Sequence, residues 1–300
     1  MSIAISMINP KNLVEPVIKW SGSKRSVAKQ LSRYIGTQER YIEPFIGGGS
    51  MLPFRQISKA VASDIIPELI NLWNQIKNYP EQVAIEYKAR WDRLQDEGHI
   101  VFYEIRDNFN KTKNEFDFLF LTRTCVNGLI RYNNNGEFNN SMHKNRPGIN
   151  PKGFKDIIYK WSYFIKDVEF KECNYRETLT DASKNDFIFL DPPYGGTKDR
   201  YTRTVFNLEH FYSELERLNS VGAKWILTFD GVAGSREYDF QLPEEIFKYK
   251  TEIKTGNSPF TKVMRTTIDA VYESVYLNFK PTTELSTNIH QNLSQELAFV

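Results

Sequence analysis

The feature of this sequence that constrains its fold most is a short apolar run that ends in two prolines. Residues 187–190, Phe-Ile-Phe-Leu, have the length and the aromatic and β-branched content of a fully buried strand, which predicts a central position in a sheet. Pro192 and Pro193 end the strand, because proline donates no backbone hydrogen bond and holds φ near one value. We therefore expect Asp191 and Tyr194 at the carboxyl edge, where open α/β sheets bind ligands.

This Asp-Pro-Pro-Tyr loop carries groups that suit the methylation of an exocyclic amine on a planar base. Such an amine is a poor nucleophile, because its lone pair is conjugated with the ring. The Asp191 carboxylate and the Pro192 carbonyl can accept its N–H groups and turn the lone pair toward an electrophile, while Tyr194 supplies a stacking face. Two prolines also commonly end a strand for structural reasons alone, so the motif indicates this chemistry without excluding an ordinary loop.

The composition is that of a globular protein. Its 300 residues predict about two domains. No stretch approaches the length of a transmembrane helix, and residues 1–15 lack the basic-then-apolar pattern of a signal peptide, which predicts a cytoplasmic protein without a membrane partner. The two cysteines, Cys125 and Cys173, and the four histidines show no metal-ligand spacing, so we expect no metal site.

Basic residues are concentrated in three windows, although the net charge is only +2. Solvated helix faces explain most such runs, but three of them beside aromatic residues fit a surface that contacts phosphates. The windows contain Lys19, Lys24, Arg25, Lys29 and Arg33, then Lys144, Arg146, Lys152 and Lys155, and finally Lys254, Lys262 and Arg265.

A first turn rich in small residues spans residues 16–24 and leads into a predicted helix at 24–34. Such a turn leaves backbone N–H groups at the helix start for an anion or a carboxylate. An ordinary capped helix explains this turn equally well, because no Walker-type pattern is present.

A second turn lies in a pattern typical of folds that bind a nucleoside cofactor. A predicted strand at residues 41–46 runs into three glycines, 47–49, and then into a helical segment at 51–56. The next predicted strand, residues 60–64, ends in Asp64, which such folds place near ribose hydroxyls. The glycine run departs from the Gly-x-Gly-x-x-Gly fingerprint and favours an adenosine cofactor other than NAD.

Between Asp64 and the buried strand lies a long insert with mainly helical patterns, at residues 67–77, 81–95, 101–110 and 116–124. Residues 127–140 follow, with Asn135-Gly136 as a type I′ hairpin signal. A two-stranded ribbon fits the DNA major groove, where Asn and Arg read base edges or grip phosphates. A polar, solvent-exposed hairpin is the commoner explanation of this composition.

The remaining elements return the chain to the sheet. Helices are expected at residues 153–166 and 208–219, and strands at 168–171, 224–229 and 272–279, the last of which closes the sheet as a hairpin strand. The polar segment 281–300 shows no periodicity, which predicts a tail.

Four motifs, taken in order, resemble the Dam family of DNA adenine-N6 methyltransferases, of the D12 class. They are Lys-Trp-x-Gly-x-Lys at 19–24, Glu-Pro-Phe-x-Gly-x-Gly-Ser at 43–50, the acid Asp64 and Asp-Pro-Pro-Tyr at 191–194. The resemblance implies an α/β fold, with a Rossmann-like methyltransferase sheet and helices on both faces. It also implies an inserted, mainly helical target-recognition domain with a β-hairpin.

By this resemblance, residues 1–66 and 153–280 form the catalytic domain, 67–152 the target-recognition domain and 281–300 the tail. The implied catalytic residues are Asp191, Pro192, Pro193 and Tyr194. The implied contacts of the cofactor, S-adenosyl-L-methionine, are Trp20, Lys24, Phe45, Gly47, Gly49, Asp64 and Asp191.

The insert is similar to the family's target-recognition segment, Asn-Gly-Leu-x-Arg-x-Asn-x-x-Gly-Glu-Phe-Asn. The resemblance implies that Arg131 reads a guanine, Leu129 touches a thymine methyl group and Lys19 lies near the first base. GATC is the leading target, although Ser141-Met142-His143 stand where GATC-specific members have Pro-Phe-Gly. Together with the basic windows, the expected DNA contacts are Lys19, Asn127, Leu129, Arg131, Asn133, Asn139, Lys144 and Arg146.

The function that these motifs predict is transfer of a methyl group to N6 of an adenine flipped out of double-stranded DNA. A cognate restriction endonuclease as a further partner stays open. So do two alternatives. One is methylation of another planar amine, on RNA adenine, cytosine N4 or a protein glutamine, and the other is a catalytically silent DNA-binding regulator that kept the fold.

Overall fold

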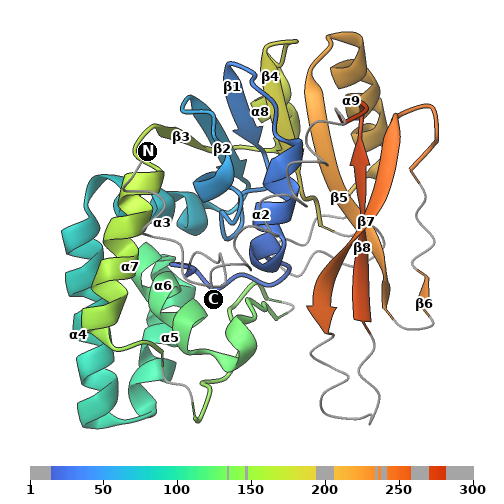
Figure 1. Cartoon of the computed structure of the whole chain (residues 1–300). Helices are drawn as coiled ribbons and strands as arrows, with labels where there is room; N and C mark the ends of the chain where they lie inside the picture. The colour runs from blue at the N-terminus through green and yellow to red at the C-terminus, as the bar shows by residue number, and fades with distance from the viewer. Residues whose placement is uncertain are drawn as a thin grey trace, which may run out of the picture.

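An eight-stranded sheet forms the centre of the computed structural model, which describes residues 15–133, 135–145, 148–193, 206–233, 236–237, 242–257 and 270–281. The strand order is β3-β2-β1-β4-β5-β8-β7, with β6 paired to β5 (Figure 1). The strands are β1 (Arg40–Glu43), β2 (Ala60–Asp64), β3 (Val168–Glu172), β4 (Asp186–Leu190), β5 (Lys224–Ala233), β6 (Arg236–Glu237), β7 (Tyr249–Asn257) and β8 (Ala270–Leu277).

The predicted buried strand is confirmed, because all five residues of β4 are buried and β4 lies in the middle of the sheet. β1 to β5 run parallel, whereas β8 pairs antiparallel with both β5 and β7. β1 lies between β2 and β4, so the chain order reverses between β1 and β4. This reversal is a topological switch point, and ligands bind at the carboxyl ends of the strands there.

Helices cover both faces of the sheet, as the resemblance implied. Alternate side chains of the strands point to opposite faces: Tyr41 and Phe187 belong to one apolar cluster, whereas Ile42 and Ile188 belong to the other. The first face is covered by α2 (Ala28–Leu31), α3 (Pro67–Asn78) and α7 (Pro151–Phe164), and the second by α8 (Tyr175–Leu179) and α9 (Leu208–Ser220).

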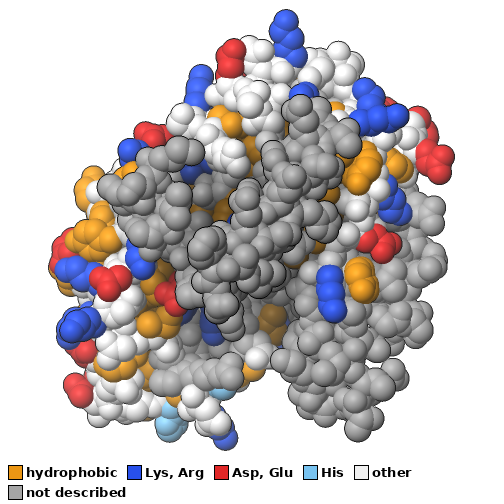
Figure 2. Space-filling view, viewed as in Figure 1, with side chains coloured by type: hydrophobic (Ala, Val, Ile, Leu, Met, Phe, Trp, Pro, Cys, Tyr) orange, Lys and Arg blue, Asp and Glu red, His pale blue; other side chains and the backbone are white. Residues whose placement is uncertain are grey.

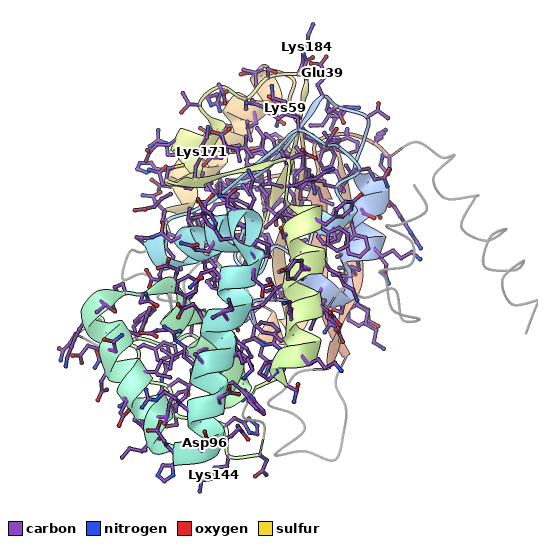
Figure 3. All side chains as sticks on the ribbon, turned by 90° about the vertical axis from the view of Figure 1, so that its left-hand side faces the viewer. Glu39, Lys59, Asp96, Lys144, Lys171 and Lys184 are labelled. Carbon is purple, nitrogen blue, oxygen red and sulfur yellow. The ribbon has the colours of Figure 1, made fainter. Side chains whose placement is uncertain are left out.

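The four helical patterns of the insert are all helices: α3, which packs on the sheet, and α4 (Pro80–Glu97), α5 (Ile100–Thr112) and α6 (Glu115–Thr124), which are grouped at the lower left in Figure 1. α4 lies beside α7, as Figure 3 shows from the side. The apolar side chains of α4, α5 and α6 belong to the same cluster as those on the first face of the sheet. The insert therefore has no apolar core of its own, and its separation as a domain stays a prediction.

Three expected elements differ in detail. The helix predicted at 24–34 consists of α2 flanked by 3₁₀ turns at Lys24–Ser26 and Ser32–Tyr34, and the helical segment at 51–56 is a single 3₁₀ turn, Leu52–Phe54. β8 does not close the sheet, because β7 pairs with its outer side.

Of the predicted tail, only residue 281 lies within the described residues. Among the helices that the structure describes, none is both long and apolar enough to span a membrane.

Candidate active site

The switch point brings the predicted catalytic and glycine-rich segments together. Asp191 follows β4 directly, and the glycine run follows β1, its parallel neighbour. Asp64 is the last residue of β2, on the other side of β1. Pro192 is buried and Pro193 half-buried, whereas Tyr194 lies outside the described residues.

Asp191 is held by an ion pair and a hydrogen bond. The Lys24 ammonium lies 2.7 Å from Asp191 Oδ1, and the Thr228 hydroxyl donates to the same oxygen at 3.0 Å. Lys24 also lies 3.0 Å from Glu273 Oε1 and donates to the Gly22 carbonyl at 3.0 Å. The side chains of Lys24 and Glu273 are each 5% exposed, and that of Asp191 is 20% exposed, so this ammonium joins two carboxylates at a largely buried site.

Burial raises the pKa of Asp191 to about 6, because a desolvated carboxylate is less stable than the neutral acid. The Lys24 ammonium opposes this rise in the pKa, and the Glu273 carboxylate adds to it. Asp191 is therefore ionised at neutral pH. Glu43, the last residue of β1, accepts a hydrogen bond from the Tyr41 hydroxyl at 2.9 Å. Burial raises the pKa of Glu43 to about 8, so this side chain is mostly protonated at neutral pH.

The glycine run is shaped by two tryptophans. Gly47 has a φ of 43°, and a Cβ there would lie 2.5 Å from Trp20 Nε1, so only glycine fits. Trp73 Nε1 donates to the Gly47 carbonyl at 3.1 Å, while the Gly47 N–H donates to Asp64 Oδ2 at 3.2 Å. Gly49, with a φ of 63°, packs on Trp73. The carboxylate at the end of β2 thus fixes the loop at the end of β1.

An aromatic group that includes Phe45 lines the same edge on the second face of the sheet. Phe45 is half-buried and stacks on Tyr175 with a centroid distance of 5.4 Å, and Phe206 meets it edge-on at 6.0 Å. The sequence reasoning did not place Tyr175 or Phe206 at the site, because they lie in segments without a recognisable motif.

The predicted hairpin is present in reduced form, as two isolated bridges, Cys125 with Met142 and Tyr132 with Phe138. Its tip is not the expected type I′ turn, since among the described residues of the tip only Gly136 has a positive φ, 79°. The Asn133 side chain accepts from the backbone N–H groups of Asn135 and Glu137, at 2.8 and 3.0 Å. Asn133 thus shapes the turn itself, as Asn commonly does.

Two predicted base-reading residues lie on the hairpin. Arg131 is exposed and donates through Nε to Asn139 Oδ1 at 2.9 Å. Asn127 is exposed with a φ of 58°, and Leu129 is half-buried.

Lys19 lies against the start of the hairpin. A Cβ on Gly128 would lie 2.8 Å from Lys19 Cδ, and Gly128 has a φ of 63°, so the close approach requires glycine. Lys19, the predicted contact of the first base, therefore touches the predicted recognition segment at Gly128, although the two residues are 109 positions apart in the chain.

Only some of the basic side chains in the three windows lie on the protein surface. Lys24 is buried beside Asp191, so it is not presented to a phosphate, whereas Lys155 is exposed and pairs with Glu81 at 2.8 Å. Lys144 is exposed, whereas Arg146, Lys262 and Arg265 lie outside the described residues. On the face shown in Figure 2, the described Lys and Arg side chains are scattered among Asp and Glu rather than gathered in one patch.

Sequence reasoning missed the two residues that complete the Asp191 environment, Thr228 and Glu273. The signal for Glu273 was available: it shares the alternation of Val275 and Leu277, whose side chains are buried. A charged residue in phase with buried positions of a strand requires a partner, and Lys24 is that partner.

Comparison with known proteins identifies the class to which this fold and site belong. A family model described as D12 class N6 adenine-specific DNA methyltransferase matches residues 20–254, well over half of the chain. The chain therefore belongs to this family and is an adenine-specific DNA methyltransferase.

Individual relatives agree with this assignment. The Type II methyltransferase M.MjaIII of Methanocaldococcus jannaschii is 29% identical over 249 residues, which cover 72% of this chain and 84% of that protein. The DNA adenine methylase of Serratia marcescens is 27% identical over 199 residues, 65% of this chain and 72% of the relative. The retron Ec67 DNA adenine methylase of Escherichia coli is 28% identical over 215 residues, 69% and 74% of the two chains.

Proposed function

We propose that this enzyme transfers a methyl group from S-adenosylmethionine to N6 of an adenine that is flipped out of double-stranded DNA. The observation that carries the proposal is the placement of Asp191: its carboxylate follows β4 at the switch point and is anchored through Oδ1 by Lys24 and Thr228. Since both anchors use Oδ1, we assign Oδ2 as the oxygen that accepts from the target amine.

The residues at this edge fit S-adenosylmethionine in their chemistry. Asp64 offers a carboxylate for ribose hydroxyls, and the loop that it fixes, with Gly47 and Gly49, has positive φ values that let a backbone approach a ligand closely. Phe45 offers an aromatic wall, and Trp20 supports the loop. When bound, the cofactor supplies an electrophilic methyl group on sulfur.

The target adenine has to leave the duplex, because its amine is unreachable inside a paired and stacked helix, and extrusion costs a few kcal/mol. In our proposal Tyr194 stacks on the flipped base. Asp191 Oδ2 and the Pro192 carbonyl accept from the amine and hold its lone pair toward the methyl donor. Positive charge develops on nitrogen as the new bond forms, and the negative Asp191 stabilises it, so no separate general base is required before transfer.

Recognition of DNA is assigned to the hairpin and to Lys19. Arg131 reads a guanine, Leu129 touches a thymine methyl group, and Lys19 contacts the first base, within a site that we propose to be GATC. Asn127, Asn133, Asn139, Lys144 and Arg146 position the segment or the DNA backbone. The contact between Lys19 and Gly128 supports this set, because it joins the two segments into one surface.

We propose that the enzyme acts in the cytoplasm. M.MjaIII is named as a Type II methyltransferase, whereas other relatives are named simply as DNA adenine methylases. A cognate restriction endonuclease is thus proposed as a partner only because this chain is similar to M.MjaIII. Transformation of the source cells with plasmid DNA, either unmethylated or methylated beforehand by this enzyme, distinguishes these cases, because a paired endonuclease lowers transformation only by the unmethylated plasmid.

Asp64→Ala tests the cofactor assignment. Loss of a carboxylate that binds ribose should raise the KM for S-adenosylmethionine about tenfold or more and leave the KM for DNA nearly unchanged. The matched control is Glu172→Ala, since Glu172 is exposed and is the register partner of Asp64 on β3. Equal cofactor KM values for Asp64→Ala and the wild type would remove Asp64 from the cofactor site.

Arg131→Ala tests base reading. A bidentate contact to guanine predicts a loss of about 1–3 kcal/mol on the matched site and little further loss on duplexes altered at that base pair. Arg131→Lys is the informative control, because lysine keeps the charge but cannot bind a guanine edge as a fork. Methylation rates are measured on duplexes changed one base pair at a time. A uniform loss on all of them, rescued by lysine, would make Arg131 a phosphate contact.

A further inference from the structure

Glu273 is a buried carboxylate for which the proposed function gives no role. It lies on β8, opposite Gly231 of β5 and Ile253 of β7, and is 4% exposed. A buried carboxylate is costly unless it is paired, and the ion pair with Lys24 at 3.0 Å provides that pairing. The same ammonium also pairs with Asp191.

The geometry around Lys24 is that of a fixed ammonium. Its three N–H donors match three acceptors at hydrogen-bond distance, which are Asp191 Oδ1, Glu273 Oε1 and the Gly22 carbonyl. These acceptors come from three separate segments, so the position of the ammonium is set by the fold rather than by Asp191 alone. Lys24 in turn sets the direction in which Asp191 is held.

The charge balance of this group has a chemical consequence. An ammonium paired with a single carboxylate would offset part of the negative potential that this carboxylate creates at the reacting nitrogen. With one ammonium between two carboxylates, a net negative charge remains at the site. That charge stabilises the positive charge that develops on the target amine.

We propose that Glu273 is a positioning residue for methyl transfer, which acts through Lys24 by holding its ammonium in place and by leaving the Lys24, Asp191 and Glu273 group negatively charged. The inference rests on the proposed role of Asp191 as the acceptor of the target amine. A residue of β8, which is far from the Asp-Pro-Pro motif in sequence, thus contributes to the reaction.

The other groups that face Asp191 do not take over this role. Thr228 on β5 donates a hydrogen bond and carries no charge. Glu43 on β1 has a pKa of about 8 because of its burial, so it is mostly neutral at pH 7. Glu273 is therefore the main source of the nearby negative charge that raises the pKa of Asp191.

The test is a pH profile of single-turnover methyl transfer with labelled S-adenosylmethionine and duplex DNA, for the wild type and Glu273→Gln. The wild-type rate should fall as pH drops through about 6, where Asp191 becomes protonated. Glutamine keeps the shape and an oxygen acceptor for Lys24 but removes the charge. We expect the plateau rate to fall about tenfold and the acid limb to move about one pH unit lower.

Glu252→Gln is the matched control, because Glu252 is an exposed residue on the neighbouring strand β7. Glu273→Asp, which restores the charge, should return the acid limb toward the wild-type pH even if the rate stays low. If Glu273→Gln folds poorly, the comparison of Glu273→Asp with the wild type carries the test.

The outcomes separate the two proposals. An unchanged profile in Glu273→Gln, or an acid limb in Glu273→Asp that lies as low as that of Glu273→Gln while the fold is intact, overturns the role of Glu273. A wild-type profile without an acid limb, together with full activity of Asp191→Asn, contradicts the proposed role of Asp191 instead.

Discussion

Asp191→Asn should lower methyl transfer at least about a hundredfold while duplex DNA binding stays within about twofold of the wild type. Asparagine keeps the shape of the side chain and an oxygen acceptor, but it removes the negative charge that stabilises the reacting amine. Binding survives because contacts between basic side chains and phosphates supply most of the affinity for DNA. The measurements are single-turnover rates at saturating cofactor and DNA affinity at fixed salt concentration.

Asp181→Asn is the matched control for this substitution. Asp181 is an acid with 70% of its side chain exposed, and it pairs with Arg40, whose strand β1 begins at the amino edge of the sheet. Its variant should methylate at the wild-type rate. Loss of DNA binding in parallel with activity, in a folded Asp191→Asn protein, would contradict the role assigned to Asp191.

Lys24→Met should destabilise the protein by about 3–5 kcal/mol at pH 8, because it leaves the buried carboxylates of Asp191 and Glu273 without their ammonium. The pKa of Asp191 in the folded protein, already raised to about 6 by burial, then rises further, because the Lys24 ammonium no longer opposes the rise. A folded pKa above the unfolded value means that stability decreases as pH rises, so part of the loss should be recovered at about pH 5. Urea unfolding at the two pH values measures this difference.

Lys184→Met is the control for a lost lysine. Lys184 is exposed at the amino edge of the sheet, where Figure 3 shows it near Glu39 and Lys59, at the opposite edge from Asp191. Its variant should unfold at nearly the wild-type urea concentration at both pH values. A Lys24→Met protein that is equally destabilised at pH 5 and pH 8 would show that the cost comes from packing rather than from unpaired carboxylates.

The core of the fold could be predicted from sequence because its signals are local. An apolar run ended by Pro192 and Pro193 and a short strand pattern that ends in Asp64 are both properties of a few consecutive residues. The same holds for the long helices of the insert, whose predicted bounds agree with the structure to within a few residues. The helix predicted at 24–34 differs, because only Ala28–Leu31 are α-helical and 3₁₀ turns lie on both sides of them.

The site could be predicted only in part, because contacts between distant segments leave little trace in sequence. Lys24 was expected to contact the cofactor, which stays a prediction, but its ion pairs with Asp191 and Glu273 were not foreseen. Thr228 could not be found, since a threonine in a strand is ordinary and only the pairing of β4 with β5 brings it to Asp191. The hydrogen bonds by which Asn133 shapes the hairpin turn were not foreseen either, and its expected role in DNA binding stays a prediction.

The most direct test of the account is the identity of the methylated atom. The wild type and Asp191→Asn are each incubated with methyl-labelled S-adenosylmethionine and a GATC-containing duplex, and the DNA is then digested to nucleosides and separated. We predict that the label appears in N6-methyldeoxyadenosine for the wild type and is nearly absent for the variant. Label in N4-methyldeoxycytidine, or equal adenine methylation by the two proteins, would contradict the account.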